Sequence, residues 1–142
     1  MRHKQELLYE MEGLLRKVFR QLRQGVNSIL EKEISRNEFF MLKALGDGPL
    51  RASELSRILE VSASHITSMS DSLVEKRLIE RKRDLTDRRM LNIAITQKGQ
   101  DKLQELDEKK TNYLFQRFES LDEEELQTLV GLFKKLDSER NE

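Results

Sequence analysis

Several residue types are scarce or missing in this chain of 142 residues, and each absence excludes a kind of chemistry. There is no cysteine, so disulfides, thiol catalysis and a thiol-based oxidation switch are all excluded. Only two histidines are present, which argues against a dedicated zinc or copper site. The five methionines could respond to oxidants, but core packing explains them better.

Long apolar runs are also missing. No stretch approaches 18 apolar residues and no secretory hydrophobic segment is visible, so we expect a soluble, cytoplasmic protein with no membrane partner. No nucleophile–base set, phosphate-binding loop or metal-ligand spacing appears. An enzyme is therefore disfavoured, and we expect no metal or other cofactor.

The charge is balanced overall but unevenly distributed. Lysines and arginines number 26, as do aspartates and glutamates, so the net charge alone does not indicate a nucleic-acid partner. Residues 76–89, however, hold seven basic and three acidic side chains, whereas residues 101–142 hold seven basic and twelve acidic ones. A local basic segment of this kind is typical of a DNA-binding surface.

Apolar spacing and capping residues predict six helices. Apolar residues at spacings of three and four predict one long amphipathic helix over residues 6–33, too long to bury its whole stripe in so small a domain. Hydrophobic staples bracket the N-caps of four further helices, at Ser35, Arg51, Ser62 and Asp122. Thr96 can cap one more helix. The predicted helices therefore span residues 6–33, 36–45, 52–59, 63–76, 97–120 and 123–138.

The two short helices over residues 52–59 and 63–76 form a helix-turn-helix candidate, because only Glu60 and Val61 separate the first from the Ser62 cap. In the second helix, Ile66, Met69 and Leu73 are predicted to face inward. Small polar side chains suited to base edges and phosphates lie at its start and opposite face: Ser62, Ser64, His65, Thr67, Ser68 and Ser72, with Asp71 among them. An ordinary solvated helix face remains an alternative.

A charged hairpin follows. Residues 78–83 and 91–95 are predicted strands, joined by the glycine-free loop 84–89. Arg88 and Arg89 lie in this loop and Arg81 on the strand before it. An arginine on such a loop can enter a narrow minor groove, and the nearby Asp87 can orient it. A solvated charged hairpin is the alternative. Separately, the position of Arg51 at a helix N-cap suggests a phosphate contact, and the alternative there is that the helix simply tolerates an arginine.

These residues resemble the MarR family of winged-helix transcriptional regulators. The resemblance rests on D-L-T-D-R-R-M-L-N-I-A-I-T-Q-K-G (residues 84–99), G-P-L-R-A-S-E-L-S-R-I-L (residues 48–59) and H-I-T-S-M-S-D-S-L-V-E-K-R-L-I (residues 65–79). It implies a mainly α fold with a small β-hairpin wing: a winged helix-turn-helix over residues 35–96, and a helical dimerisation region over residues 1–34 and 97–142.

The same resemblance implies a homodimer that binds a pseudo-palindromic operator in double-stranded DNA, usually as a repressor. Release by a small aromatic or lipophilic effector is expected of the family. Asp87 would orient Arg89 toward the minor groove. Two residues depart from the family pattern: Ser68 stands where many members have Arg, and Arg77 stands where Gly is usual, which strains the backbone if φ is positive there.

One alternative comes from another class of protein. A dimeric winged-helix scaffold that binds protein and not DNA would fit the zero net charge and the serine-rich helix. A salt titration separates the two, because DNA affinity falls steeply with salt as phosphate contacts release counterions.

Overall fold

The computed structural model describes residues 2–30 and 33–138. The chain divides into two compact units, residues 1–110 and residues 111–142. The first holds the helix-turn-helix and the hairpin, and the second holds the end of one helix and all of the last.

Helix α1, Arg2–Leu30, is the long amphipathic helix that the apolar spacing predicts, although it begins earlier than residue 6. The predicted end at Glu33 is wrong: residues 31–32 lie outside the described ranges, and Glu33 is in a turn. Leu30 is fully buried, whereas Leu7, Leu8 and Leu14 remain about half exposed within the chain. Among the described residues, the N-terminal half of the apolar stripe is therefore only partly covered.

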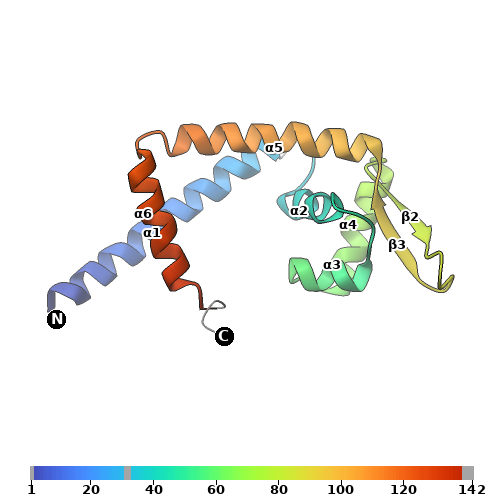
Figure 1. Cartoon of the computed structure of the whole chain (residues 1–142), viewed down its shortest axis with the longest axis horizontal. Helices are drawn as coiled ribbons and strands as arrows, with labels where there is room; N and C mark the ends of the chain where they lie inside the picture. Colours follow the sequence, from blue (N-terminus) through green and yellow to red (C-terminus); the bar gives the residue numbers. More distant parts are fainter. Residues whose placement is uncertain (1, 31–32, 139–142) are drawn as a thin grey trace. The chain divides into compact units, whose positions relative to one another are not determined.

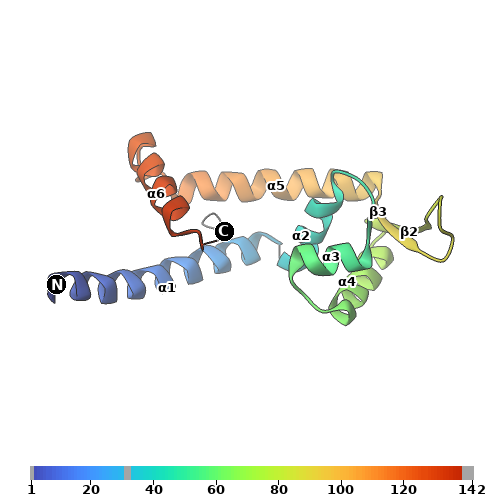
Figure 2. The same cartoon turned by 60° about the horizontal axis from the view of Figure 1, so that its bottom comes forward.

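Three short helices form the centre of the first unit: α2 (Arg36–Leu45), α3 (Ala52–Leu59) and α4 (Ala63–Glu75). Their predicted starts are confirmed. Ser35 and Glu38 form a reciprocal capping box on α2, and the Ser62 hydroxyl accepts the His65 N–H on α4. Figures 1 and 2 both show α2, α3 and α4 clustered together, with the β2–β3 hairpin projecting from them.

A three-stranded antiparallel sheet with the order β1-β3-β2 supports the hairpin. Strand β3 (Leu91–Ile95) was predicted from the alternation of its apolar residues. Strand β2 (Ile79–Arg83) was also predicted, one residue longer, whereas β1 (Leu50–Arg51) was not. A strand of two residues has no period to detect, and it exists only because Leu50 and Arg51 pair with Ile93 and Asn92. This small strand ties the start of α3 to the hairpin.

The core of the first unit lies where α2, α3 and α4 meet the sheet. Its fully buried members include Phe39, Leu55, Ile66 and Leu73, together with Leu106 from the next helix. Helix α5, Gln97–Arg117, begins in this unit, and the Thr96 hydroxyl accepts the Gly99 N–H as the predicted cap. The core holds the helix-turn-helix and the base of the hairpin in one body.

The second unit contains the C-terminal end of α5 and helix α6, Glu123–Leu136. Asp122 caps α6 in a box with Glu125, as predicted, but α5 and α6 end at Arg117 and Leu136 and not at residues 120 and 138. None of the helices in the described ranges is long and apolar enough to cross a membrane.

Candidate nucleic-acid interface

Helix α4 presents a polar face beside a buried one. Ile66, Met69 and Leu73 are buried, as predicted. Most of the predicted polar residues are exposed: Ser62, Ser64, His65, Thr67 and Ser68. The hydroxyls of Ser62 and Ser64 lie 3.1 Å apart, and the Thr67 hydroxyl donates to the Ala63 carbonyl at 3.1 Å. The first two turns of α4 therefore offer small hydroxyls and one imidazole on an exposed surface.

Ser72 differs from the other predicted residues on α4. It is only partly exposed, and its hydroxyl lies near enough to the Glu38 carboxylate, at the start of α2, to lower the pKa of that group. Burial raises the pKa of Glu38, but hydrogen bonds from the Ser35 backbone and Ser72, and the charge of Lys76, outweigh it and leave the pKa lowered. Ser72 therefore supports the contact between α2 and α4.

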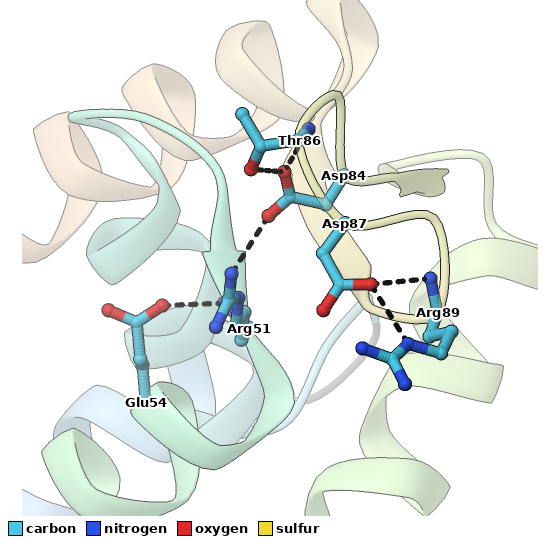
Figure 3. Close-up of polar contacts among 6 residues, drawn as sticks. All are labelled: Arg51, Glu54, Asp84, Thr86, Asp87 and Arg89. Carbon is cyan, nitrogen blue, oxygen red and sulfur yellow. Dashed lines mark hydrogen bonds and ion pairs between the residues drawn. The ribbon is translucent and has the colours of Figure 1, made fainter.

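The hairpin loop holds the most exposed of the predicted cations. One carboxylate oxygen of Asp87 accepts the Arg89 backbone N–H at 3.1 Å and the Arg89 Nε–H at 3.3 Å (Figure 3). The Arg89 side chain is still 91% exposed. The predicted pairing of Asp87 with Arg89 is confirmed, and it restrains the guanidinium without covering it.

Arg88 lies between these two residues in the loop, and Arg81 lies on the strand before the loop. Arg88 is exposed, and its carbonyl accepts a hydrogen bond from the Arg83 guanidinium at 2.6 Å. Arg81 on β2 pairs with Asp71 on α4 at 2.6 Å. The Arg81–Asp71 pair joins the hairpin to the helix that precedes it.

Arg51 lies at the start of α3, and its guanidinium donates to the Asp84 carboxylate at 2.9 Å (Figure 3). The other Asp84 oxygen accepts the backbone N–H and the hydroxyl of Thr86, each at 2.8 Å. These hydrogen bonds, led by the Thr86 backbone N–H, hold the pKa of Asp84 well below its usual range. Asp84 therefore remains charged throughout the neutral and mildly acidic range.

Sequence reasoning found the arginines but did not predict that Asp71 pairs with Arg81 and Asp84 with Arg51. The spacing of Asp84 and Thr86 is a detectable local signal, because an aspartate often accepts the N–H two residues on. No local pattern could pair Arg51 with Asp84, or Asp71 with Arg81, since each pair joins separate elements.

Metal binding finds no support in the arrangement of acidic and imidazole groups. Across residues 2–30 and 33–138, no three such side chains come close enough together to hold a metal ion.

The helices α3 and α4 with the adjoining hairpin define a winged helix-turn-helix, a class of DNA-binding domain. The MarR family pattern matches residues 34–91 of this chain. The uncharacterized HTH-type transcriptional regulator YpoP of Bacillus subtilis is 51% identical over 141 residues, which cover 99% of this chain and all of that protein. The chain belongs to the MarR family and is a DNA-binding transcriptional regulator.

Other relatives agree with this assignment. The HTH-type transcriptional repressor MdtR of Bacillus subtilis is 29% identical over 108 residues, covering 75% of this chain and 70% of MdtR. A MarR family protein from Bacillus stearothermophilus has a structure that superposes with a TM-score of 0.82 at 28% identity, covering 97% and 98% of the two chains. The predicted mainly α fold with a hairpin wing is thereby confirmed, and YpoP and MdtR are both named as transcriptional regulators.

Proposed function

We propose that two copies of this chain bind a pseudo-palindromic operator, with each α4 in the major groove and each hairpin loop in the flanking minor groove. The observation that carries this proposal is Arg89, whose guanidinium is restrained by Asp87 yet almost fully exposed at the hairpin loop. A narrow minor groove concentrates negative potential, so a restrained, exposed guanidinium is well suited to enter it.

In the major groove, the exposed residues of α4 contact bases and phosphates: Ser62, Ser64, His65, Thr67 and Ser68. Small hydroxyls allow close approach of the helix and can donate or accept hydrogen bonds at base edges. The free N–H groups at the start of α4 favour a phosphate there. Since Ser68 replaces an arginine common in the family, we expect the wing to supply a larger share of the affinity than the helix.

Dimerisation through the terminal helices, residues 1–34 and 97–142, would hold two DNA-binding regions of residues 35–96 in a fixed register. The support is the uncovered apolar surface on α1 and on α6, each considered on its own. A two-fold dimer presents two identical recognition surfaces, which is why its operator is expected to be a pseudo-palindrome.

The regulator acts as a repressor that a small aromatic or lipophilic effector releases. A cavity of about 220 Å³ in the first unit supports such an effector. The residues that line it include the aromatic Phe19 and Phe40 and the basic Arg23, Arg36 and Lys110. Burial and the nearby charge of Lys43 lower the pKa of Lys110, whose ammonium lies over the Phe40 ring at 5.1 Å. An aromatic acid would fit these walls.

Selection of bound duplexes from a random pool tests the operator directly. We expect an enriched pseudo-palindromic consensus, and Arg89→Ala should weaken binding to that consensus by about 1–3 kcal/mol with the dimer still folded. Anisotropy titrations at several salt concentrations supply the affinities and the salt slope.

Lys109→Ala is the matched control, because it also removes one exposed cation but lies on α5, outside the wing. Unchanged affinity of the Arg89 variant would mean that the hairpin does not enter the groove. Failure to bind any duplex at low salt would favour the protein-binding scaffold.

A further inference from the structure

Helix α3 begins with a residue that cannot cap it. An N-cap side chain normally accepts an N–H of the first turn, and Ser, Thr, Asp and Asn do this best. Arg51 has only donors, and no side-chain capping bond is made at this position. Its backbone N–H is instead satisfied by the Glu54 carboxylate at 3.0 Å. The guanidinium of Arg51 is therefore available for a contact outside the helix.

That contact is the Asp84 carboxylate, at the point where the hairpin loop leaves β2. The Asp84 backbone N–H donates to the Met90 carbonyl at 3.0 Å and closes the loop across its base. The Asp84 side chain is 14% exposed, and it accepts from both Arg51 and Thr86. One carboxylate thus fixes the turn of the loop and anchors that turn to α3.

Arg51 is itself rigidly placed. It belongs to β1, where it pairs with Asn92 on the central strand, and it directly precedes α3. The ion pair of Arg51 with Asp84 therefore links the helix-turn-helix to the exposed loop. Asp84 precedes Arg89 by five residues, so a change of the loop at its base would move the guanidinium at its far side.

We propose that the Arg51–Asp84 ion pair, the wing clamp, positions the hairpin so that Arg89 reaches the minor groove. Both members are positioning residues and not DNA contacts. This inference rests on the proposed entry of the hairpin into the groove. It differs from a role of Arg51 as a phosphate contact, and the two roles predict opposite effects when Asp84 loses its charge.

The deciding variant is Asp84→Asn. The amide oxygen of asparagine can still accept the Thr86 N–H, so the turn is retained and only the ionic contact is lost. If Arg51 binds phosphate, removal of a nearby negative charge frees Arg51 and tightens DNA binding. If the wing clamp operates, binding to the selected consensus weakens by about tenfold, as expected for coupled neighbours in one ion-pair network.

The mechanism is tested by a double-mutant cycle with Arg89→Ala. A clamp that acts through Arg89 has nothing to position once that side chain is gone, so Asp84→Asn should then change affinity less than twofold. A purely structural defect would add its full effect in both backgrounds. Arg51→Gln should match Asp84→Asn, and the two together should be no worse than either.

Glu80→Gln is the control, since it removes one exposed carboxylate from β2 that pairs only locally with Lys82. It should leave binding unchanged or slightly tighter. Thermal melting and sedimentation confirm that each variant remains folded and assembled as the parent protein; if Asp84→Asn does not fold, Arg51→Gln carries the same cycle.

Two results overturn the wing clamp: tighter or unchanged binding by Asp84→Asn, or an equal loss with and without Arg89. Failure of the proposed function itself is distinguishable, because Arg89→Ala alone would then leave the affinity unchanged.

Discussion

At the scale of single residues, Gly99 shows how closely α5 approaches the sheet. A Cβ atom placed there would lie 2.1 Å from the Leu78 carbonyl oxygen and 2.7 Å from the Ile95 side chain. The same Leu78 carbonyl accepts the Thr96 N–H at 3.0 Å, so the backbone cannot move away without losing that bond. No side chain, however small, fits at residue 99.

We therefore predict that Gly99→Ala lowers the free energy of unfolding by about 1–3 kcal/mol, the usual cost of overpacking a tight site. Urea denaturation measures the change. Gln100→Ala, one residue on and exposed on the same helix, should change stability by less than about 0.5 kcal/mol. A neutral effect of Gly99→Ala would show that α5 can shift away from β2.

Arg77 is a second residue whose backbone matters. Its φ is 64°, so the condition under which Arg strains the backbone at this position is met. A left-handed conformation costs a non-glycine residue about 1–2 kcal/mol. The Arg77 carbonyl accepts the Thr96 hydroxyl at 2.7 Å, and the Lys76 carbonyl accepts the Lys98 ammonium at 3.2 Å. These two bonds from the start of α5 hold the strained turn in place.

At the scale of elements, the starts of helices were predictable and their ends were not. Capping boxes such as Ser35 with Glu38 act over three residues, so the sequence alone contains both partners. The predicted ends of α5 and α6 were wrong by two or three residues, because no glycine or proline marks them. Local chemistry specifies a start more strongly than an unmarked end.

Glu38 joins two elements and provides a prediction on pH. Its net pKa is lowered in the folded protein, since hydrogen bonds and Lys76 outweigh burial. A group with a lowered folded pKa stabilises the fold fully above its unfolded pKa, and that contribution is lost as the pH falls through the folded value. The charged carboxylate should therefore stabilise the packing of α2 on α4 at neutral pH.

We predict that Glu38→Gln reduces the free energy of unfolding by about 1–2 kcal/mol at pH 7. The gap between parent and variant should shrink as the pH falls below about 4.5. Denaturation curves between pH 3 and pH 7 measure it, with Glu54→Gln as the comparison at another helix start. A gap that does not vary with pH would mean that the charge of Glu38 contributes nothing.

At the scale of the whole molecule, large apolar side chains remain uncovered in both units. On α1, Leu7 is 51% exposed, and in the second unit Phe115 and Leu136 are 72% and 73% exposed. Surfaces of this kind on a monomer are typical of protein–protein interfaces. The length of the first helix had already indicated that its apolar stripe could not all be buried within one small domain.

We predict that sedimentation of the intact chain at micromolar concentration shows a dimer. Phe115→Glu should weaken the dimer by about tenfold or more, because a charge would replace a large apolar side chain at the interface. Gln116→Glu introduces the same charge at the neighbouring exposed position and should have little effect. A parent protein that sediments as a stable monomer would contradict the proposed role of the terminal helices.

The sequence by itself determined the parts that depend on near neighbours. Asp87 and Arg89 are two residues apart, the Ser62 cap acts on His65, and Glu60 and Val61 alone separate the Ser62 cap from α3, so each feature could be derived before the fold was known. The apolar spacing of α4 likewise specified which face would be buried.

Only the tertiary structure decided what Arg51 does. Its partner Asp84 is 33 residues away along the chain. Because 37% of the chain is charged, many other acidic residues were equally plausible partners on sequence grounds. Strand β1 brings Arg51 beside the hairpin, and the pairing follows from that approach. Contacts between residues this far apart in sequence depend on how the chain folds in three dimensions, which the spacing of residues does not reveal.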